Sequence, residues 1–388
     1  MATSNEGSED DLSGGCYPIH IKDILNNQYQ ITRKLGDGGS STVWLALDIK
    51  FRRHVAVKII VASKADRAAD EIAMYEHLCQ SVPSAYSVYV TELLDSFQLQ
   101  RPDGIYHCLV LEAMGPDVDD MLEYHPSLVS AASTHYPIWM VKSILKQVLQ
   151  SLAFLHKHGI VHGDVQPGNV LFSVPSFPNC ATEELEQFAN DSKDISPSVP
   201  KVDDNTDENH VAEARSLGEY VSLEPGFTVK LADIGSAFLM NNPPKKAYTP
   251  LDLRSPELIL KNQLDEKLDI WSFGCLFFEI MTGKALFSPP LVGAEAEHRD
   301  NEHLWQMHDR LGFFSRDMVL GEMKHISGGD DVPSAMSLES KFNSLKPMDC
   351  SETEASRITN LMRRILQYDP TKRPTASEIL GDVWFAGE

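Results

Sequence analysis

The spacing of apolar side chains predicts the regular elements of this chain. Residues 29–35 alternate between polar and apolar side chains, which predicts a strand, and residues 55–60 form an apolar run short enough for a buried strand. Residues 139–158 carry apolar side chains at helical spacing and are followed by Gly159, which predicts a core helix with a glycine C-cap. Residues 227–232 predict a further apolar strand after a long polar stretch.

The stretch His162–Phe172 follows the predicted core helix and ends in an apolar strand. It contains Asp164 and Asn169, five residues apart on a loop. An aspartate at such a place accepts or orients the proton of an attacking hydroxyl group, and an asparagine oxygen binds magnesium, so the pair suits phosphoryl transfer. Loops are rich in both residue types for reasons of turn geometry. The spacing of Asp164 and Asn169 therefore indicates phosphoryl transfer only together with the motifs around it.

A glycine-rich stretch follows the strand over residues 29–35. It fits the pattern GxGxxGxV, with Ser41 in place of the third glycine. Glycines let backbone amides approach phosphate groups without a side chain in the way, although a plain hairpin turn has the same composition. The residues concerned are Leu35, Gly36, Asp37, Gly38, Gly39, Ser40, Ser41, Thr42 and Val43.

Lys58 lies inside the apolar run over residues 55–60. A lysine in a buried strand is costly unless it is paired, so a carboxylate partner is expected. Glu71 lies on a helical stretch downstream and is the proposed partner, with Asp70 as a rival and a solvated helix face as the alternative reading of Glu71. Such a pair leaves the lysine placed to bind the α- and β-phosphates of a nucleotide.

Three later motifs complete the series. Asp233 opens an Asp-Ile-Gly turn and is expected to bind magnesium. Glu257 lies in a Ser-Pro-Glu motif, and the resemblance of this series to protein kinases implies a buried structural ion pair between Glu257 and Arg373. Asp269 opens an apolar helix, and the same resemblance implies that it braces the backbone of the loop around Asp164.

Taken together, these motifs resemble those of eukaryotic protein kinases, and SR-protein kinases of the CMGC group in particular. The resemblance covers residues 17–387 outside an acidic spacer and is carried by Tyr17–Leu35, Gly36–Leu45, Val141–Phe172, Leu231–Ala237, Ala285–Pro289 and Asn301–Met307. It implies an α+β bilobal fold with a small antiparallel-sheet lobe over residues 17–114 and a large, mainly helical lobe over residues 115–388. Residues 1–16 read as a disordered acidic tail.

The resemblance also implies a site for ATP and Mg2+. Leu111 would be the gatekeeper, backbone groups of Glu112 and Met114 would bind the adenine, and Leu171 would lie beneath it. The nucleotide site would further include Ala56, Lys58, Glu71 and residues 35–43, and Asn169 and Asp233 would bind the metal. Asp164, Lys58, Gln166 and Asn169 are the candidate catalytic residues.

Two residues of the catalytic stretch depart from the usual kinase pattern. Gly163 replaces the usual arginine, so a phosphate on the activation segment would lack its customary partner, and SR-protein kinases also lack that arginine. Gln166 replaces a lysine that neutralises the transferring phosphate. Loss of a charge-assisted contact in a transition state costs roughly 2–4 kcal/mol, so slow catalysis is expected.

The charge of the chain indicates its partners. A net charge of −22 disfavours nucleic acid and anionic membranes and favours a basic protein substrate, with Arg/Ser-rich splicing factors suggested by the resemblance. Residues 173–226 hold twelve acidic and three basic residues and read as a disordered acidic spacer, as found at this place in SR-protein kinases. A CMGC-type insert is expected over about residues 288–350. The candidates for substrate docking there are Glu295, Glu297, Asp300 and Glu302, although an ordinary solvated loop explains them as well.

Compartment and assembly follow from weaker signals. The six cysteines show no metal-ligand spacing, which favours free thiols in the cytosol or nucleus. The N-terminus does not resemble a secretory signal, and no apolar run is expected to reach the ~20 residues of a membrane span. A monomer is the default of the family.

Two other functions remain open. The first is a pseudokinase, a nucleotide-binding scaffold with little phosphotransfer, favoured by Gln166, Ser41 and the unusual substrate strip Pro250–Arg254. The second is phosphotransfer to a small molecule, which the complete helical half and the CMGC-type insert disfavour.

Overall fold

The computed structural model describes residues 15–79, 87–125, 127–128, 135–174, 217–244, 247, 249–261, 264–289, 296–312 and 336–386. The chain forms two compact units. The sheet unit takes its described residues from 1–76, 92–115 and 174–222, and the helical unit takes its own from 77–91, 116–173 and 223–388.

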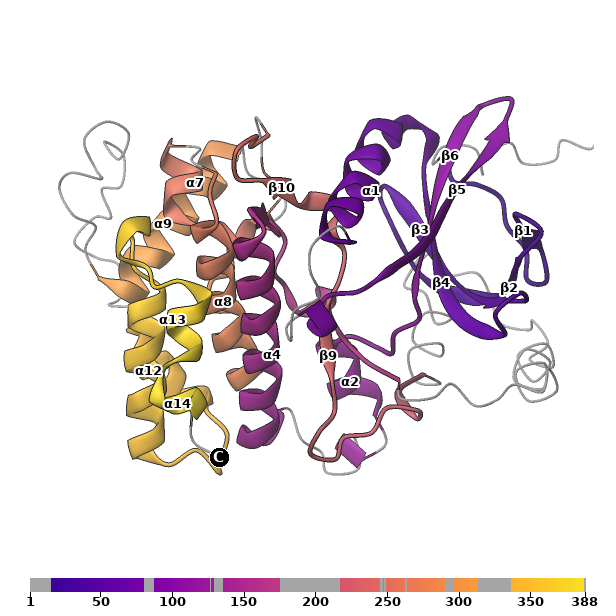
Figure 1. Cartoon of the computed structure of the whole chain (residues 1–388). Coiled ribbons are helices and arrows are strands. Elements are labelled where there is room, and N and C mark those ends of the chain that lie inside the picture. The colour runs from indigo at the N-terminus through magenta and orange to yellow at the C-terminus, as the bar shows by residue number, and fades with distance from the viewer. Residues whose placement is uncertain are drawn as a thin grey trace, which may run out of the picture. The chain divides into compact units, whose positions relative to one another are not determined.

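The sheet unit contains a six-stranded antiparallel sheet with the order β1-β2-β3-β4-β6-β5 (Figure 1). Its strands are β1 (Ile24–Leu25), β2 (Tyr29–Gly38), β3 (Ser41–Asp48), β4 (Arg53–Ile60), β5 (Leu93–Arg101) and β6 (Gly104–Glu112). The short 3-10 helix η2 (Ala62–Lys64) and helix α1 (Ala65–Cys79) follow β4. Neighbouring strands are close in sequence, except that α1 and β5 separate β4 from its partner β6.

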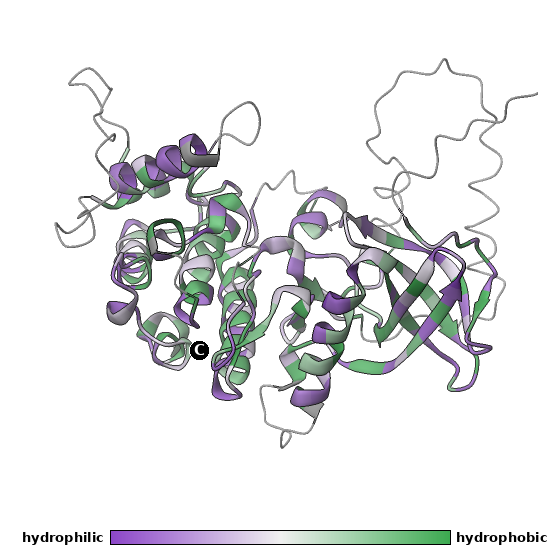
Figure 2. Ribbon diagram, turned by 90° about the horizontal axis from the view of Figure 1, so that it is seen from above, coloured by the Kyte–Doolittle hydropathy of each residue, from purple (hydrophilic) through white to green (hydrophobic). Residues whose placement is uncertain are grey.

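The core of the sheet unit forms on one face of this sheet. Tyr29 and Ile31 of β2 are buried while Gln30 between them is only partly covered, as the alternating sequence predicts. Val55 and Val57 of β4 join the same cluster. Strand colours in Figure 2 accordingly change along the sheet between hydrophobic and hydrophilic.

The helical unit is built around α4 (Ile138–Lys157) and α8 (Lys267–Thr282), which pack against each other. The other helices of this unit are α2 (Val118–Tyr124), α7 (Pro256–Lys261), α9 (Ala296–Leu311), α11 (Leu338–Leu345), α12 (Glu352–Ile365), α13 (Ala376–Leu380) and α14 (Val383–Ala386), most of which are labelled in Figure 1. Two small antiparallel pairs join β7 (Ile160–Val161) to β10 (Phe238–Leu239) and β8 (Val170–Phe172) to β9 (Val229–Leu231). The 3-10 helices are η3 (Ser87–Tyr89), η4 (Pro167–Asn169), η5 (Ile234–Ser236), η6 (Leu251–Leu253) and η7 (Pro370–Lys372).

Helix α4 corrects two details of the sequence reading. Its C-cap is His158, and Gly159 follows with φ +72, because the left-handed residue of such a cap lies one position beyond it. The helix is also twenty residues long and apolar enough to cross a membrane by length and composition, contrary to expectation. In the protein, 72% of its apolar window is buried, which is the packing of a core helix.

The sheet and the helix-rich remainder confirm the predicted α+β fold class. The predicted disordered tail lies outside the described residues up to position 14, and the predicted acidic spacer does so over residues 175–216. Residues 290–295 and 313–335 of the expected insert also lie outside them, whereas α9 and α11 are described.

Candidate active site

The glycine-rich stretch forms the hairpin between β2 and β3. Gly36 pairs with Val43, Asp37 with Thr42 and Gly38 with Ser41, so Gly39 and Ser40 form the two-residue turn. A Cβ atom on Gly38 or Gly39 would meet nothing within 4 Å. Packing inside the protein therefore does not explain these glycines, and the backbone of this turn is open to the approach of a ligand.

Lys58 and Glu71 form the ion pair that the sequence predicts. The Nζ atom of Lys58 donates to both carboxylate oxygens of Glu71, at 2.9 and 3.1 Å. Their side chains are 9% and 3% exposed, so β4 and α1 are joined by a buried charge pair. The rival Asp70 is exposed.

Strand β6 places the residues expected around an adenine. Leu111 lies beside Ala56 of β4 in the sheet, and Met114 is buried just beyond the strand. The backbone N–H of Glu112 donates to the carbonyl oxygen of Glu92 at 3.1 Å. A bond from Glu112 to an adenine would therefore have to use its carbonyl oxygen.

In the helical unit, amide groups hold both carboxylate oxygens of Asp164. Gln166 Nε2 donates to Oδ1 at 2.8 Å, and Asn169 Nδ2 donates to Oδ2 at 2.9 Å and to the Asp164 carbonyl oxygen at 2.8 Å. Burial raises the pKa of Asp164, and the negative charge of Asp233 adds to the shift, while His162 and the two amides oppose it. A partly buried aspartate with a raised pKa is a stronger proton acceptor than an exposed one.

The loop around Asp164 is braced from α8, as predicted. The carboxylate of Asp269 accepts the backbone N–H groups of His162 and Gly163, both at 2.8 Å, and Nε2 of His156 lies 2.8 Å from it. Asp269 is buried, which disfavours its charge, but the His156 contact, the charge of His162 and the Gly163 amide lower its pKa overall. Gly163 has φ +77, and a Cβ there would lie 2.8 Å from the Ser236 carbonyl oxygen.

The candidate metal ligands suit a hard cation. Asn169 uses its amide nitrogen on Asp164, which leaves Oδ1 as the acceptor, and Asp233 has φ +58 at the start of η5. Magnesium takes oxygen ligands and is commonly held by one or two side chains together with nucleotide phosphates. No group of three His, Cys, Asp or Glu residues able to hold a metal occurs in the described part of the chain.

Glu257 and Arg373 form the predicted structural pair. Two guanidinium nitrogens of Arg373 each donate to one Glu257 oxygen at 2.6 Å, and both side chains are almost fully buried. The sequence reading missed Thr249, whose buried hydroxyl donates to the Gly163 carbonyl oxygen at 3.0 Å. Its place just before the strip Pro250–Arg254 was the available signal.

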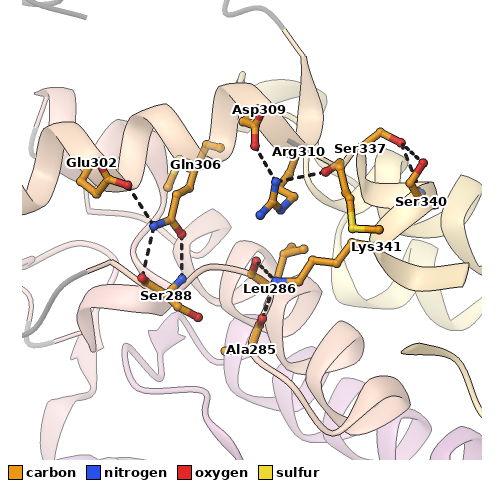
Figure 3. Close-up of polar contacts among 12 residues, drawn as sticks. Ala285, Leu286, Ser288, Glu302, Gln306, Asp309, Arg310, Ser337, Ser340 and Lys341 are labelled. Atoms are coloured by element: carbon orange, nitrogen blue, oxygen red, sulfur yellow. Dashed lines mark hydrogen bonds and ion pairs between the residues drawn. The ribbon is translucent and has the colours of Figure 1, made fainter. Parts of the chain in front are cut away.

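The acidic docking candidates of the insert have mixed outcomes. Asp300 lies 3.6 Å from Arg254 Nη1, and Glu302 contacts Gln306 at 3.4 Å, so both already have partners in the chain (Figure 3 shows Glu302 and Gln306). Glu295 and the side chain of Glu297 lie outside the described residues.

The family model described as "Protein kinase domain" matches residues 29–178 and 219–385. This chain belongs to the protein kinase family. The serine/threonine-protein kinase SRPK of Physarum polycephalum is 30% identical over 99% of this chain and 92% of its own length. Protein kinase dsk1 of Schizosaccharomyces pombe is 24% identical over 99% of this chain and 85% of its own length. SRSF protein kinase 3 of Mus musculus is 36% identical over 44% of this chain and 30% of its own length.

These relatives confirm the resemblance inferred from the motifs. The chain is a serine/threonine protein kinase of the SR-protein kinase type within the CMGC group. The bilobal kinase fold expected from the sequence is confirmed with it.

Proposed function

We propose that this kinase transfers phosphate from ATP to serine or threonine hydroxyl groups of basic proteins. The arrangement around Asp164 is the observation that carries the proposal. Its carboxylate is held by two amides and has a pKa raised by burial, and Asp269 braces the backbone just before it through the N–H of Gly163. Those are the requirements of a group that accepts a hydroxyl proton during transfer.

The other candidate residues have supporting roles. The buried Lys58–Glu71 pair would hold the α- and β-phosphates, and the hairpin over residues 36–43 would lie over them. Asn169 and Asp233 would hold magnesium, which neutralises charge on the phosphates when it is bound. Asp164 would orient the substrate hydroxyl and take its proton at a carboxylate oxygen.

Gln166 is the residue that limits the expected rate. Its amide donor is directed at Asp164 Oδ1, and it carries no positive charge to offset the transferring phosphate. We expect turnover about 10²–10³ below that of an enzyme with lysine at this position. The same observation favours the second candidate, a pseudokinase that binds nucleotide and transfers little phosphate.

Basic substrates are proposed from charge. The net charge of −22 attracts cationic segments over distances of about a Debye length. One relative is named an SRSF protein kinase, and Arg/Ser-rich splicing factors are the substrate class that we propose by analogy. The proposal includes no direct contact with nucleic acid.

Compartment and assembly are also proposals. Cys16, Cys108, Cys275 and Cys350 are free thiols, which supports a reducing compartment such as the cytosol or nucleus. We propose a monomer without membrane attachment. Fractionation of cells and light scattering of the purified chain test these two points.

The experiment is transfer of radiolabel from ATP, with magnesium, to an Arg/Ser-repeat peptide. Wild-type protein should label the peptide, Asp164→Ala should not, and a Gln166→Lys variant should be faster by at least tenfold. A peptide in which glutamate replaces arginine controls for charge. The pseudokinase would be supported instead if the wild type bound ATP with magnesium but labelled no peptide, and if Gln166→Lys also labelled none.

A further inference from the structure

Arg254 connects the substrate strip to the insert helix α9. Its Nε atom donates to the carbonyl oxygen of Thr249 at 3.1 Å, and its Nη1 atom lies 3.6 Å from Asp300 Oδ1 on α9. The two side chains of this ion pair are 36% and 34% exposed. One guanidinium group thus contacts both the insert helix and Thr249, the residue just before the strip.

Thr249 continues this connection into the catalytic loop. Its hydroxyl donates to the carbonyl oxygen of Gly163, the residue just before Asp164. The N–H of the same glycine donates to Asp269, so Gly163 is held from the strip on one side and from α8 on the other. A shift in the position of Thr249 would therefore move the backbone of Gly163, beside Asp164, directly through this hydrogen bond.

Helix α9 is fixed firmly enough to support Arg254. The side-chain amide of Gln306 receives the Ser288 N–H at 2.8 Å and donates to the Ser288 carbonyl oxygen at 3.2 Å (Figure 3). His303 is fully buried, and its ring lies 5.2 Å from Phe287, which stacks on Trp271 of α8 at 6.0 Å.

The loop around Ser288, which is hydrogen-bonded to α9, is also hydrogen-bonded to α11. Lys341 Nζ donates to the carbonyl oxygens of Ala285 and Leu286, at 2.9 and 2.8 Å (Figure 3). The segment from Ala285 to Ser288 is thus held by both insert helices. Asp300 therefore projects from a fixed support, and Arg254 can be positioned by it.

We propose that Asp300 and Arg254 are positioning residues, which hold the substrate strip against the catalytic loop from the insert helix. This proposal rests on the proposed phosphotransfer function. Gly163 has no side chain that could pair with a phosphate on the activation segment, so another device must hold the strip. The contacts from Asp300 through Arg254 and Thr249 to Gly163 supply it, and they need no phosphorylation.

The test measures kcat and KM with a short peptide that carries a single phosphoacceptor. Asp300→Asn should lower kcat about two- to five-fold, as for loss of an ion pair whose side chains are about one-third exposed, with KM unchanged. Thr249→Val, which removes the hydroxyl with little change of shape, should lower kcat about tenfold. The double variant Asp300→Asn with Thr249→Val should have the same kcat as Thr249→Val alone, because both changes interrupt the same series of contacts from Asp300 to Gly163.

Glu339→Gln is the matched control. It breaks the ion pair of Glu339 with Arg363, whose side chains are 40% and 37% exposed and which has no contact with the strip among the described residues. This control should lower stability and leave kcat unchanged. Arg254→Lys, which keeps the charge but cannot make both contacts, should resemble Asp300→Asn.

Hydrogen exchange separates this proposal from the proposed function. In Asp300→Asn, the backbone amides of Thr249 and residues 251–254 should exchange faster than in the wild type, while Glu339→Gln should leave them unchanged. This readout does not require phosphotransfer, so it tests the positioning role even in an inactive protein. Unchanged exchange of these amides in Asp300→Asn, or a raised KM with kcat unchanged, would overturn the proposal.

Discussion

Glu257 and Arg373 form a buried ion pair, and its loss should be among the most destabilising changes in the helical unit. Glu257→Gln leaves the guanidinium of Arg373 buried without an anion. The group keeps three backbone carbonyl acceptors, at Gln367, Lys267 and Tyr368, and lies 5.0 Å from the Trp271 ring. Those contacts offset part of the loss, so we expect a cost near the low end for a broken buried pair, about 3 kcal/mol.

Arg373→Met should cost more than Glu257→Gln. It leaves the Glu257 carboxylate buried without a cation and also removes the donor to the three carbonyl groups. We therefore expect the free energy of unfolding to fall by about 4–5 kcal/mol. The double variant Glu257→Leu with Arg373→Met should cost no more than Arg373→Met alone, because no unpaired charge remains buried.

Urea denaturation at pH 7, followed by tryptophan fluorescence, measures these differences. Trp271 lies under Arg373 and is a suitable reporter. The reasoning would be refuted by a cost below about 1 kcal/mol for Glu257→Gln, the value of an exposed pair. Strict additivity of Glu257→Leu and Arg373→Met, each measured alone and in their double variant, would refute it as well, since residues in contact should be coupled.

Three further predictions concern the site and its support. Gly163→Ala forces a side chain into positive φ, 2.8 Å from the Ser236 carbonyl oxygen, and should cost about 1–2 kcal/mol in urea unfolding and slow any phosphotransfer. His303 is buried, neither ring nitrogen has a hydrogen-bond partner among the described residues, and burial lowers its pKa to about 3. The folded state therefore favours the neutral ring, so stability is full above pH 6.5 and falls below it; between pH 7 and 5 the wild type should lose about 2 kcal/mol that His303→Met does not lose. Lys58→Met leaves Glu71 buried without its cation and should abolish the rise in Tm that magnesium-ATP produces in the wild type.

Residues close in sequence account for much of what could be predicted about the site. The spacing of Asp164 and Asn169 on one loop, and the glycine-rich hairpin between two strands, depend on local geometry and could be predicted from composition and order. The Lys58–Glu71 contact could be predicted because a lysine in a buried strand requires an anion within reach. Family likeness supplied the partner of Glu257, which lies 116 residues from Arg373 along the chain.

Other features depended on where distant segments come to lie. The role of Thr249 was not predicted. Its hydroxyl donates to the Gly163 carbonyl oxygen, 86 residues away, and the residue type alone does not indicate which backbone group a threonine will contact. From the sequence, Asp300 was a candidate for substrate docking or an ordinary solvated residue, while in the structure Arg254 is its partner. Helix α4 is long and apolar enough for a membrane span, and only its burial by other elements of the structure identifies it as a core helix.

The sequence by itself therefore determined the kind of chemistry, since the residue types that bind phosphate, hold magnesium and accept a proton occur in order with their local spacing. Only the tertiary structure decided how that chemistry is supported. Both oxygens of Asp164 are held by amides, Gly163 is fixed from α8 and from Thr249, and Arg254 is anchored on α9. The physical reason is that hydrogen bonds and ion pairs act over a few ångströms in space, and chain folding rather than sequence order brings those partners within that range.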